Sequence, residues 1–441
     1  MYKRQVQSSN LNAGSGALMV GASDAANVDT VIATASGALG AAIGVVTNII
    51  TTDHSTGVVV TGTSTDKSSL TGTSVSVDAD AKEGISSLLI AASGAQYAAV
   101  SASVNVNRQL SDVSAAVDQT EVLGSFAQNA NYLGRITTSA ITAAGSQYAA
   151  VPISVVINYA DNAVSSSVAH SILRAEGQSA SVGANRISEF SSLNVTASGA
   201  MYGAAAGLVN VNTIEGATSA EVNDSEVKAG QFSVNAENED HLKVTDVTAT
   251  GAIGSLGASV VVSYFKGSSA ANLRNSIVTA DKLTVSSLQD HYVNGTVAFA
   301  SGGIGTIGAN VFSLVIGSGD NPFASNRQDL GSAEDTVNKY LSDYASSGTG
   351  SLGFITGNDE LTQEEKDKIV GSAAAADASV SSGSGNGTSV VVSGNYLTVG
   401  SSDVSVKEDS KAGSIDVTLG SGSAGAGAVS YTHLRAHETA A

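Results

Sequence analysis

One short sequence recurs along this chain and limits what the chain can fold into. The clearest copies are "ASGAQYAAVSASVNVN" at 92–107, "AAGSQYAAVPISVVIN" at 143–158 and "ASGAMYGAAAGLVNVN" at 197–212. Alignment on one glycine extends the repeat to six copies, with anchors at Gly37, Gly94, Gly145, Gly199, Gly251 and Gly302. The anchors are spaced by 57, 51, 54, 52 and 51 residues. A period of about 53 residues is too long for leucine-rich or ankyrin repeats.

A second anchor precedes each glycine by 15 residues in all six copies. It is Ala22, Ala79, Ala130, Ala184, Ala236 or Ser287. Around it the apolar residues alternate, as in "SVSVDADA" at 74–81 and "QFSVNA" at 231–236. A period of two is the strand period, whereas a helical solenoid needs 3.6. The repeat is therefore built from strands.

A third element follows each glycine run and contains a break in the alternation. Ser166, Val168, Ser171, Leu173 and Ala175 give one example. A two-residue gap of this kind indicates a corner between two strands. Each copy then holds five or six short strand-like pieces, which predicts two three-sided coils of about 26 residues. The expected fold is all-β, an elongated parallel β-solenoid with coils about 4.8 Å apart.

Small and polar residues of the repeat suit such a narrow interior. Glycine at the anchor fits a tight corner that needs positive φ. Tyrosine lies three residues later in three copies, at Tyr97, Tyr148 and Tyr202. We expect these rings to pack in the core or wall, with a row that binds sugars as the alternative. Asparagine ends each run and either adopts left-handed turns or forms ladders between coils (Asn48, Asn105, Asn107, Asn158, Asn210, Asn212).

The repeat is interrupted once, and both chain ends differ from it. Helical spacing in "SAEDTVNKYLSDYA" and a capping-box pair, Thr362 and Glu365, predict a helical insertion over 319–378. We expect solenoid repeats over 6–318 and a solenoid continuation over 379–428. Residues 1–5 and 429–441 resemble translated sequencing-adapter read-through, so they are excluded from the fold prediction. The natural chain is then expected to continue at both ends.

Composition excludes several classes of partner. The net charge of −19 argues against nucleic acid and against anionic membrane surfaces. There is no cysteine, hence no disulfide framework and no thiolate metal site. The least polar stretch, 88–106, is broken by Gln96 and several serines, so we expect no membrane insertion by this segment.

Residues that could carry chemistry are few and scattered. Four histidines lie outside the excluded ends, and none has a second histidine or a cysteine at metal-ligand spacing (His54, His170, His241, His291). His170 occupies an outward position of the third element, so we expect it to face solvent. Two acidic groups are interpreted as solvated strand ends, with weak calcium sites as the alternative (Glu237, Glu239 and Asp240; Asp78, Asp80 and Glu83). "GGIGTIGAN" at 302–310 lacks the aspartate of nonapeptide calcium repeats. The sequence therefore predicts no catalytic, cofactor-binding or metal-ligating residues.

The repeat resembles those of large leukotoxin-type filamentous adhesins from Gram-negative anaerobes. That family alternates "GAxGAAVAVN" runs with "AxIxxSxV" and "VxVxAxS" segments, which are matched here by 94–107, 199–212, 220–227 and 232–236. The resemblance covers 11–318 and 395–428. It implies a cell-surface or extracellular, autotransporter-like protein that is exported by type V secretion through an outer-membrane partner outside this segment.

The resulting hypothesis is a non-catalytic structural stalk fragment of a surface-exposed or secreted adhesin. Host or neighbouring-cell receptors would be bound by other parts of the full-length chain. One alternative is a β-helical polysaccharide lyase or hydrolase, but such enzymes need clustered charges and aromatic subsites. This chain has 5% aromatic residues and no tryptophan. A calcium-dependent secreted repeat protein is a further alternative.

Overall fold

The computed structural model describes residues 2–317, 376–383, 388–393, 396–424 and 428–432. This part of the chain is all-β and contains no helix, which is consistent with a parallel β-solenoid. The strands are β1 (Tyr2–Gln7), β2 (Asn10–Asn12), β3 (Ala17–Ala38), β4 (Ala41–Thr61), β5 (Ser68–Ala95), β6 (Ala98–Asp118), β7 (Thr120–Ser146), β8 (Ala149–Ala169), β9 (Ile172–Gly199), β10 (Gly203–Asn223), β11 (Glu226–Gly251), β12 (Gly254–Arg274), β13 (Ile277–Gly302), β14 (Gly305–Gly317), β15 (Ala376–Gly383), β16 (Thr388–Ser393), β17 (Tyr396–Ala424) and β18 (Ala428–Thr432).

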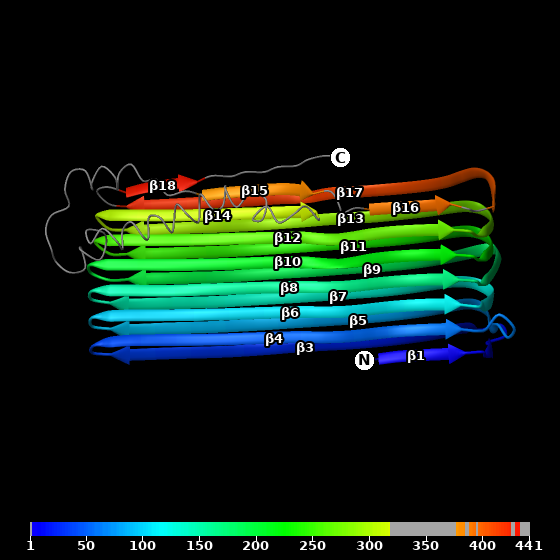
Figure 1. The fold of residues 1–441 in the computed structure, drawn as a ribbon, viewed down its shortest axis with the longest axis horizontal. Helices are drawn as coiled ribbons and strands as arrows, with labels where there is room; N and C mark the ends of the chain where they lie inside the picture. Colours follow the sequence, from blue (N-terminus) through cyan, green and yellow to red (C-terminus); the bar gives the residue numbers. More distant parts are fainter. Residues whose placement is uncertain (1, 318–375, 384–387, 394–395, 425–427, 433–441) are drawn as a thin grey trace.

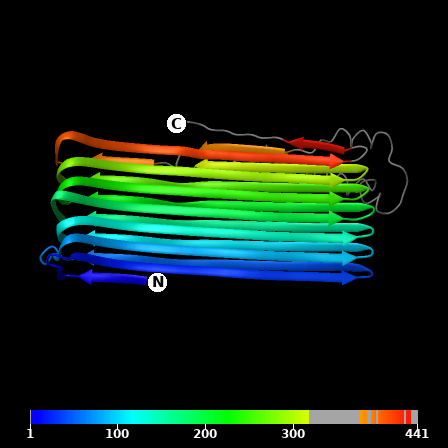
Figure 2. The same ribbon diagram turned by 180° about the vertical axis from the view of Figure 1, so that it is seen from behind.

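Successive long strands alternate between two sheets. Sheet A has the order β1-β4-β6-β8-β10-β12-β14-β15, and β16 and β18 pair with β12 and β14. Sheet B has the order β17-β13-β11-β9-β7-β5-β2, and β3 pairs with β5. Every strand pair is parallel. After each pair of strands, one in each sheet, the chain is therefore back at the end of the stack from which it started. Figures 1 and 2 show the two layers face to face, with strands that run side by side and twist little.

The register places the two sequence anchors opposite their counterparts in the next layer. In sheet B, Gly94 pairs with Gly145 and Gly145 with Gly199. Ala79 pairs with Ala130 and Ala130 with Ala184 in the same way. Because the anchors are neighbours in space, side chains 51–57 positions apart contact each other directly.

The subdivision into two three-sided coils is wrong. One turn of the chain has only two strands, of 21 residues in β6 and 27 residues in β7, for example. At about 3.3 Å per residue, a 28-residue strand such as β5 is about 90 Å long, whereas seven stacked layers rise only about 30 Å. The long dimension of the described region is therefore the strand direction and not the stacking direction (Figure 1).

The predicted corner in the third element is confirmed. β8 ends at Ala169 and β9 begins at Ile172. His170 has φ +47° and starts the turn, and Gln119, Asp224 and Asn275 adopt the same left-handed conformation in other layers. The Ser171 hydroxyl donates to Ala169 O at 2.6 Å and accepts from Thr120 N at 3.1 Å. Ser225 repeats both bonds, so a column of hydroxyls satisfies the turn backbone.

Strict alternation places every second side chain in the narrow interior. One apolar cluster lies near this turn and includes Val77, Phe126 and Leu173. A second cluster lies farther along the strands and includes Ile136, Phe190 and Phe265. Buried polar residues of the same inward parity lie between the two clusters, such as Arg186 and Asp240, and beyond the second one, such as Thr142 and Asp246. The core is thus layered along the strand direction.

The boundaries predicted for the helical insertion and for the two excluded ends differ from those in the structure. Residues 318–375, which hold nearly all of the predicted helical insertion, lie outside the described residues. Ala376, Asp377 and Ala378 belong to strand β15, so the insertion prediction is wrong at its last three positions. Strands β1 and β18 include residues of the two ends that were excluded from the fold prediction, and they pair with β4 and β14.

The glycine anchors lie at the corner that was expected, because strands such as β9 and β11 end at Gly199 and Gly251, but the expected positive φ is absent. A methyl group added at Gly199 would meet nothing within 4 Å, and its φ lies outside the left-handed range. Gly216 has the constraint instead, because its φ is +126° and an added Cβ would lie 2.1 Å from Asn162 O.

We therefore expect Gly199→Ala to change the free energy of unfolding by less than about 0.5 kcal/mol. Gly216→Ala should lower it by roughly 2 kcal/mol or more, because both backbone conformation and space oppose a side chain. Urea denaturation of the two full-length variants measures the difference. Equal losses would contradict this account of the turns and strand bends.

Candidate functional site

The four histidines lie in four different surroundings. His170 is exposed, as expected, but it occupies a turn between Asp118 and Asp224, with Nδ1–Oδ1 and Nε2–Oδ2 distances of 2.9 and 3.8 Å. His54 points into the interior, 3.3 Å from Asp24 Oδ2. His241 lies on the outer face of sheet B and stacks on Tyr292 at 4.6 Å. His291 is buried. The structure does not bring these histidines together.

The interpretation of both acidic groups as solvated strand ends is wrong. Glu83 and Asp240 lie in the middle of β5 and β11, and both are buried. Burial raises the pKa of Glu83, although a hydrogen bond from Ser111 opposes the rise. Burial raises the pKa of Glu237 too, helped by the neighbouring charges of Glu239 and Asp290. These carboxylates are therefore divided between the interior and the outer face of sheet B.

Arg186 forms the centre of a buried charged layer that the sequence did not reveal. Its Nη2 lies 3.2 Å from Asp240 Oδ1, its Nε donates to Asn238 Oδ1 at 2.8 Å, and Nη1 donates to Glu215 O. Both charged side chains have 0% exposure. Burial alone would raise the pKa of Asp240, but Arg186 and the His291 side chain hold it below its usual value. Arg186 shares inward parity with Val182 and Ala184, which is the signal that could have placed it inside.

His291 completes this layer on the next strand. Its Nδ1 lies 3.2 Å from Asp240 Oδ2, and Gln289 Nε2 lies 3.1 Å from its Nε2. Because the amide of Gln289 donates, Nε2 accepts and the ring hydrogen is on Nδ1, facing Asp240. A His–Asp pair of this kind is familiar from catalytic sites. Here both side chains are enclosed, so no substrate can reach the pair from the described surface.

The asparagines that recur in the repeat form ladders in the interior. Asn107 Nδ2 donates to Asn158 Oδ1 at 3.0 Å, and Asn158 Nδ2 donates to Asn212 Oδ1 at 2.9 Å. Asn48 and Asn105 form a parallel ladder at 3.1 Å. The ladder prediction is confirmed, whereas the left-handed turn alternative is wrong, because all these residues lie within strands.

Asp246 terminates this polar layer with a buried carboxylate. It accepts from Asn194 Nδ2 at 2.7 Å and from Asn210 Nδ2 at 3.2 Å. Both donors are neutral amides, which stabilise the ionised carboxylate less than a cation would. Burial consequently raises the pKa of Asp246 to about 7, despite the two hydrogen bonds that lower it. This group can change charge near neutral pH inside the core.

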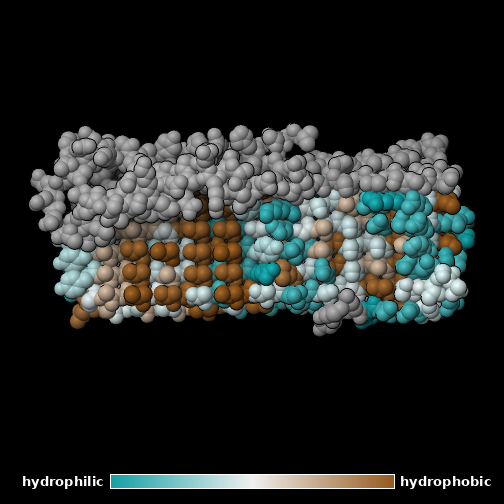
Figure 3. All heavy atoms as spheres, viewed as in Figure 1, coloured by the Kyte–Doolittle hydropathy of each residue, from teal (hydrophilic) through white to brown (hydrophobic). Residues whose placement is uncertain are grey.

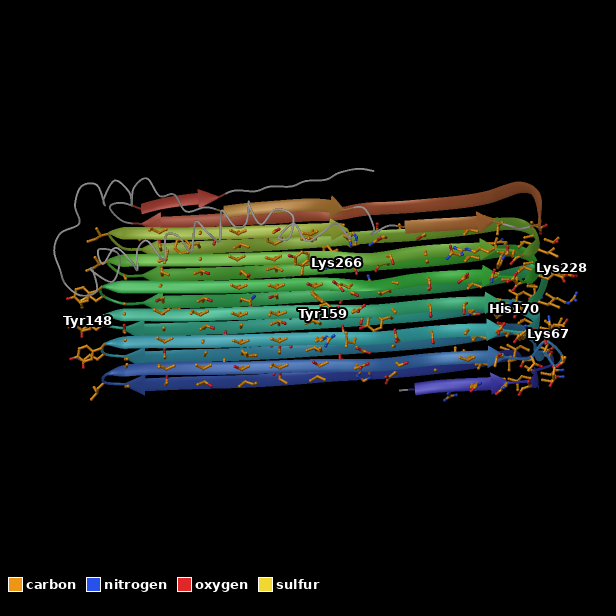
Figure 4. The ribbon with its side chains drawn as sticks, in the orientation of Figure 1. Lys67, Tyr148, Tyr159, His170, Lys228 and Lys266 are labelled. Atoms are coloured by element: carbon orange, nitrogen blue, oxygen red, sulfur yellow. The ribbon has the colours of Figure 1, made fainter. Side chains whose placement is uncertain are left out.

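The three repeat tyrosines, which were expected in the core or wall, form a stacked column at a turn outside the core clusters. Tyr97 stacks on Tyr148 at 5.4 Å and Tyr148 on Tyr202 at 5.3 Å. They lie between sheets at the turn opposite His170, as Figure 4 shows for Tyr148 and His170. Each ring covers its neighbour's face, so the stack itself uses the surfaces that would bind a sugar.

Two shallow hollows lie along sheet B. One, of about 640 Å³, is lined by small residues at the strand ends, including Ala143, Ser198 and Gly251. The other, of about 380 Å³, is lined by Arg135, Glu189, His241, Lys243 and Tyr292 among others. Arg135 pairs with Glu189 at 2.5 Å and His241 with Glu239 at 2.8 Å. Arg135 and Glu189 thus neutralise each other within the second hollow.

Two further kinds of feature are absent from the described residues. In the described ranges, no group of three or more His, Cys, Asp or Glu side chains is placed to hold a metal ion. The same residues contain no helix long and apolar enough to cross a membrane.

Comparisons with known proteins give no relative. No family model matches the sequence. No curated protein matches it. No solved structure matches the fold.

Proposed function

We propose that the chain is a non-catalytic structural segment of a surface-exposed or secreted bacterial filamentous adhesin, built as a solenoid of about 53-residue repeats. The observation that carries the proposal is the in-register pairing of each layer with the next, seen in five successive anchor pairs of sheet B. Such a stack can be lengthened by whole layers, each adding about 4.8 Å. The resemblance of the repeat to leukotoxin-type adhesins supports the same function.

The interior chemistry also supports a structural role. Its charged and amide groups are used in contacts between layers, such as Arg186 with Asp240 and Asn158 with Asn212. These contacts fix the register of neighbouring strands rather than present groups to a substrate. On this proposal, export follows the type V route at a Gram-negative outer membrane, and a chain without cysteine crosses unfolded with no disulfide to block it.

The test places residues 1–441 between a signal peptide and an outer-membrane β-barrel anchor in a Gram-negative host. We expect protease-resistant chain on the cell surface, with no release of reducing ends or unsaturated products from a panel of polysaccharides. Replacing calcium in the buffer by a chelator should shift the melting temperature of the purified chain by less than about 2 °C, which is under about 2 kcal/mol at this size.

The alternatives predict other results. Product release from any polysaccharide would indicate a β-helical lyase or hydrolase. A melting temperature that falls by many degrees with the chelator would indicate a calcium-dependent repeat protein. Retention of the chain in the periplasm would contradict export by this route.

A further inference from the structure

The outer face of sheet A carries a regular array of aliphatic side chains, which we call the apolar face. It consists of outward residues near the start of four adjacent strands: Ile43, Val45 and Ile49 of β4; Val100, Ala102, Val104 and Val106 of β6; Val151, Ile153, Val155 and Ile157 of β8; Ala205, Val209 and Val211 of β10. Thr47 and Gly207 are the exceptions within this array. Figure 3 shows the array as hydrophobic stripes that cross the strands.

The stripes follow from the strand register. Val104 pairs with Thr47 and Val155, and Val155 pairs with Val209. Ile49, Val106, Ile157 and Val211 form the next stripe by the same pairings. Several members are substantially exposed, among them Ile49 at 70%, Ile153 at 44% and Val209 at 38%.

The apolar face has a polar border of the kind that surrounds interface cores. Arg108 lies over the Tyr159 ring at 5.6 Å, and Lys266 pairs with Glu215 at 3.0 Å. Tyr159 also donates to Glu215 at 3.1 Å. Figure 4 shows Tyr159 and Lys266 midway along the strands, where the stripes end in Figure 3.

We infer that two copies of this chain pack their apolar faces against each other, sheet on sheet. Both copies present the same stripes about 6.6 Å apart, with side chains about 4.8 Å apart within each stripe, so the side chains of one copy can lie between those of the other, as in paired cross-β sheets. The small twist of the strands lets the two faces touch over their whole extent (Figures 1 and 2).

The size of the apolar face fits a weak, repeat-dependent contact. The apolar face is seven residues long and four strands wide, which corresponds to an area on the order of 450 Å² per copy, or about 900 Å² for the pair. This is at the lower limit for a specific interface, so dissociation constants in the micromolar range are expected. Each further layer with the same outward residues would enlarge the contact. The inference concerns this surface alone and does not depend on the proposed cell-surface role.

The net charge gives the association a characteristic salt dependence. Two copies of −19 each repel, while the apolar face itself contributes no charge. Added sodium chloride screens this repulsion. Association of the faces should therefore tighten with salt, whereas a contact made by ion pairs would weaken.

Sedimentation velocity of the full chain from about 1 to about 100 µM tests the inference at two salt concentrations. The face variant combines Ile153→Lys with Ile157→Lys. The control combines Leu193→Lys with Ile141→Lys, whose parent residues are 45% and 39% exposed on the outer face of sheet B, against 44% and 36% for the face variant. We expect reversible dimers of the parent chain, at least about tenfold weaker dimers of the face variant, and an unchanged control.

A second readout does not require lysine in a strand. The chain has no cysteine, so Ile153→Cys and Leu193→Cys each introduce a single thiol. A flexible bis-maleimide should cross-link two Ile153→Cys chains and leave Leu193→Cys monomeric.

Three results would overturn the inference. The first is a parent chain that stays monomeric throughout, or that loses association equally in face variant and control. The second is a monomer in which only the face variant is less stable to urea, which would identify residues 318–375 of the same chain as the cover. The third is a monomer that co-sediments with neutral phosphatidylcholine vesicles through this face, which would identify a lipid surface instead.

Discussion

Arg186→Met should lower the free energy of unfolding by about 3–5 kcal/mol, the usual cost of leaving a buried charge without its partner. Methionine has similar length but no charge, so Asp240 would keep only the His291 and Asn238 contacts. Asn238 Oδ1 and Glu215 O would each lose a donor as well. Urea denaturation of the full chain at neutral pH measures this loss.

A matched arginine provides the control. Arg135 lies on the neighbouring strand β7, but its side chain is 58% exposed and pairs with Glu189 on the outer face. Arg135→Met should change stability by less than about 1 kcal/mol, because solvent screens this pair.

The double variant Arg186→Met with Asp240→Asn removes both buried charges. It should recover part of the loss caused by Arg186→Met alone. If the double variant lost more free energy of unfolding than the two single variants lose together, Arg186 would act through packing rather than through charge.

The pH dependence of the Arg186–Asp240 pair follows from the lowered pKa of Asp240. A carboxylate whose pKa is lower in the folded than in the unfolded state stabilises the fold above its unfolded pKa. That contribution is lost as pH falls through the folded pKa. The difference in free energy of unfolding between the parent chain and Arg186→Met should therefore become smaller below about pH 4.

Periodicity alone predicted much of the fold. The alternation around Ala79 and Ala236 identified strands, and the gap before Ser171 identified a turn. The fixed distance between Ala79 and Gly94 holds because both lie in one strand, β5. Local patterns of this kind report the direction of side chains, which is set by residues close in sequence.

The strand lengths could not be predicted because the interior is partly polar. Asp240, with Glu237 and Glu239, was interpreted as the end of a strand, since charged residues are rarely buried without partners. The partners of Asp240, Arg186 and His291, are 54 and 51 residues away in sequence and are adjacent only through the sheet register. Asp240 has the same parity as Phe232 and Val234. Alternation that continues through a polar residue in this way indicates one long strand.

The same reasoning explains the glycine anchors. A glycine in every copy suggested a strained corner, yet Gly145 and Gly199 have open space around a potential Cβ. Gly124 and Gly216 have positive φ inside strands, and Gly177, which lies 53 residues after Gly124, has it too. The strained glycines therefore occupy bends within strands, whereas the glycine anchors occupy the unstrained ends of strands.

Asp246→Asn should remove a pH-dependent loss of stability of up to about 4 kcal/mol between pH 4 and pH 7, because three pKa units correspond to that free energy. The pKa of Asp246 is raised from 3.8 to about 7 by burial. Between these values the folded state binds a proton that the unfolded state has lost, so the stability of the parent chain falls as pH rises. Above about pH 7 the full cost of the buried carboxylate remains.

The variant and the parent should therefore have similar stability near pH 4, and the variant should be the more stable at pH 8. Asparagine keeps an oxygen that accepts from Asn194 and Asn210, so the polar layer retains its shape. The exposed Asp161 serves as control, and Asp161→Asn should leave the slope of stability against pH unchanged. Urea denaturation of all three full-length chains from pH 4 to pH 8 gives these slopes. Parallel curves for the parent and Asp246→Asn would mean that Asp246 is ionised at little cost, through water or a counter-ion inside the stack.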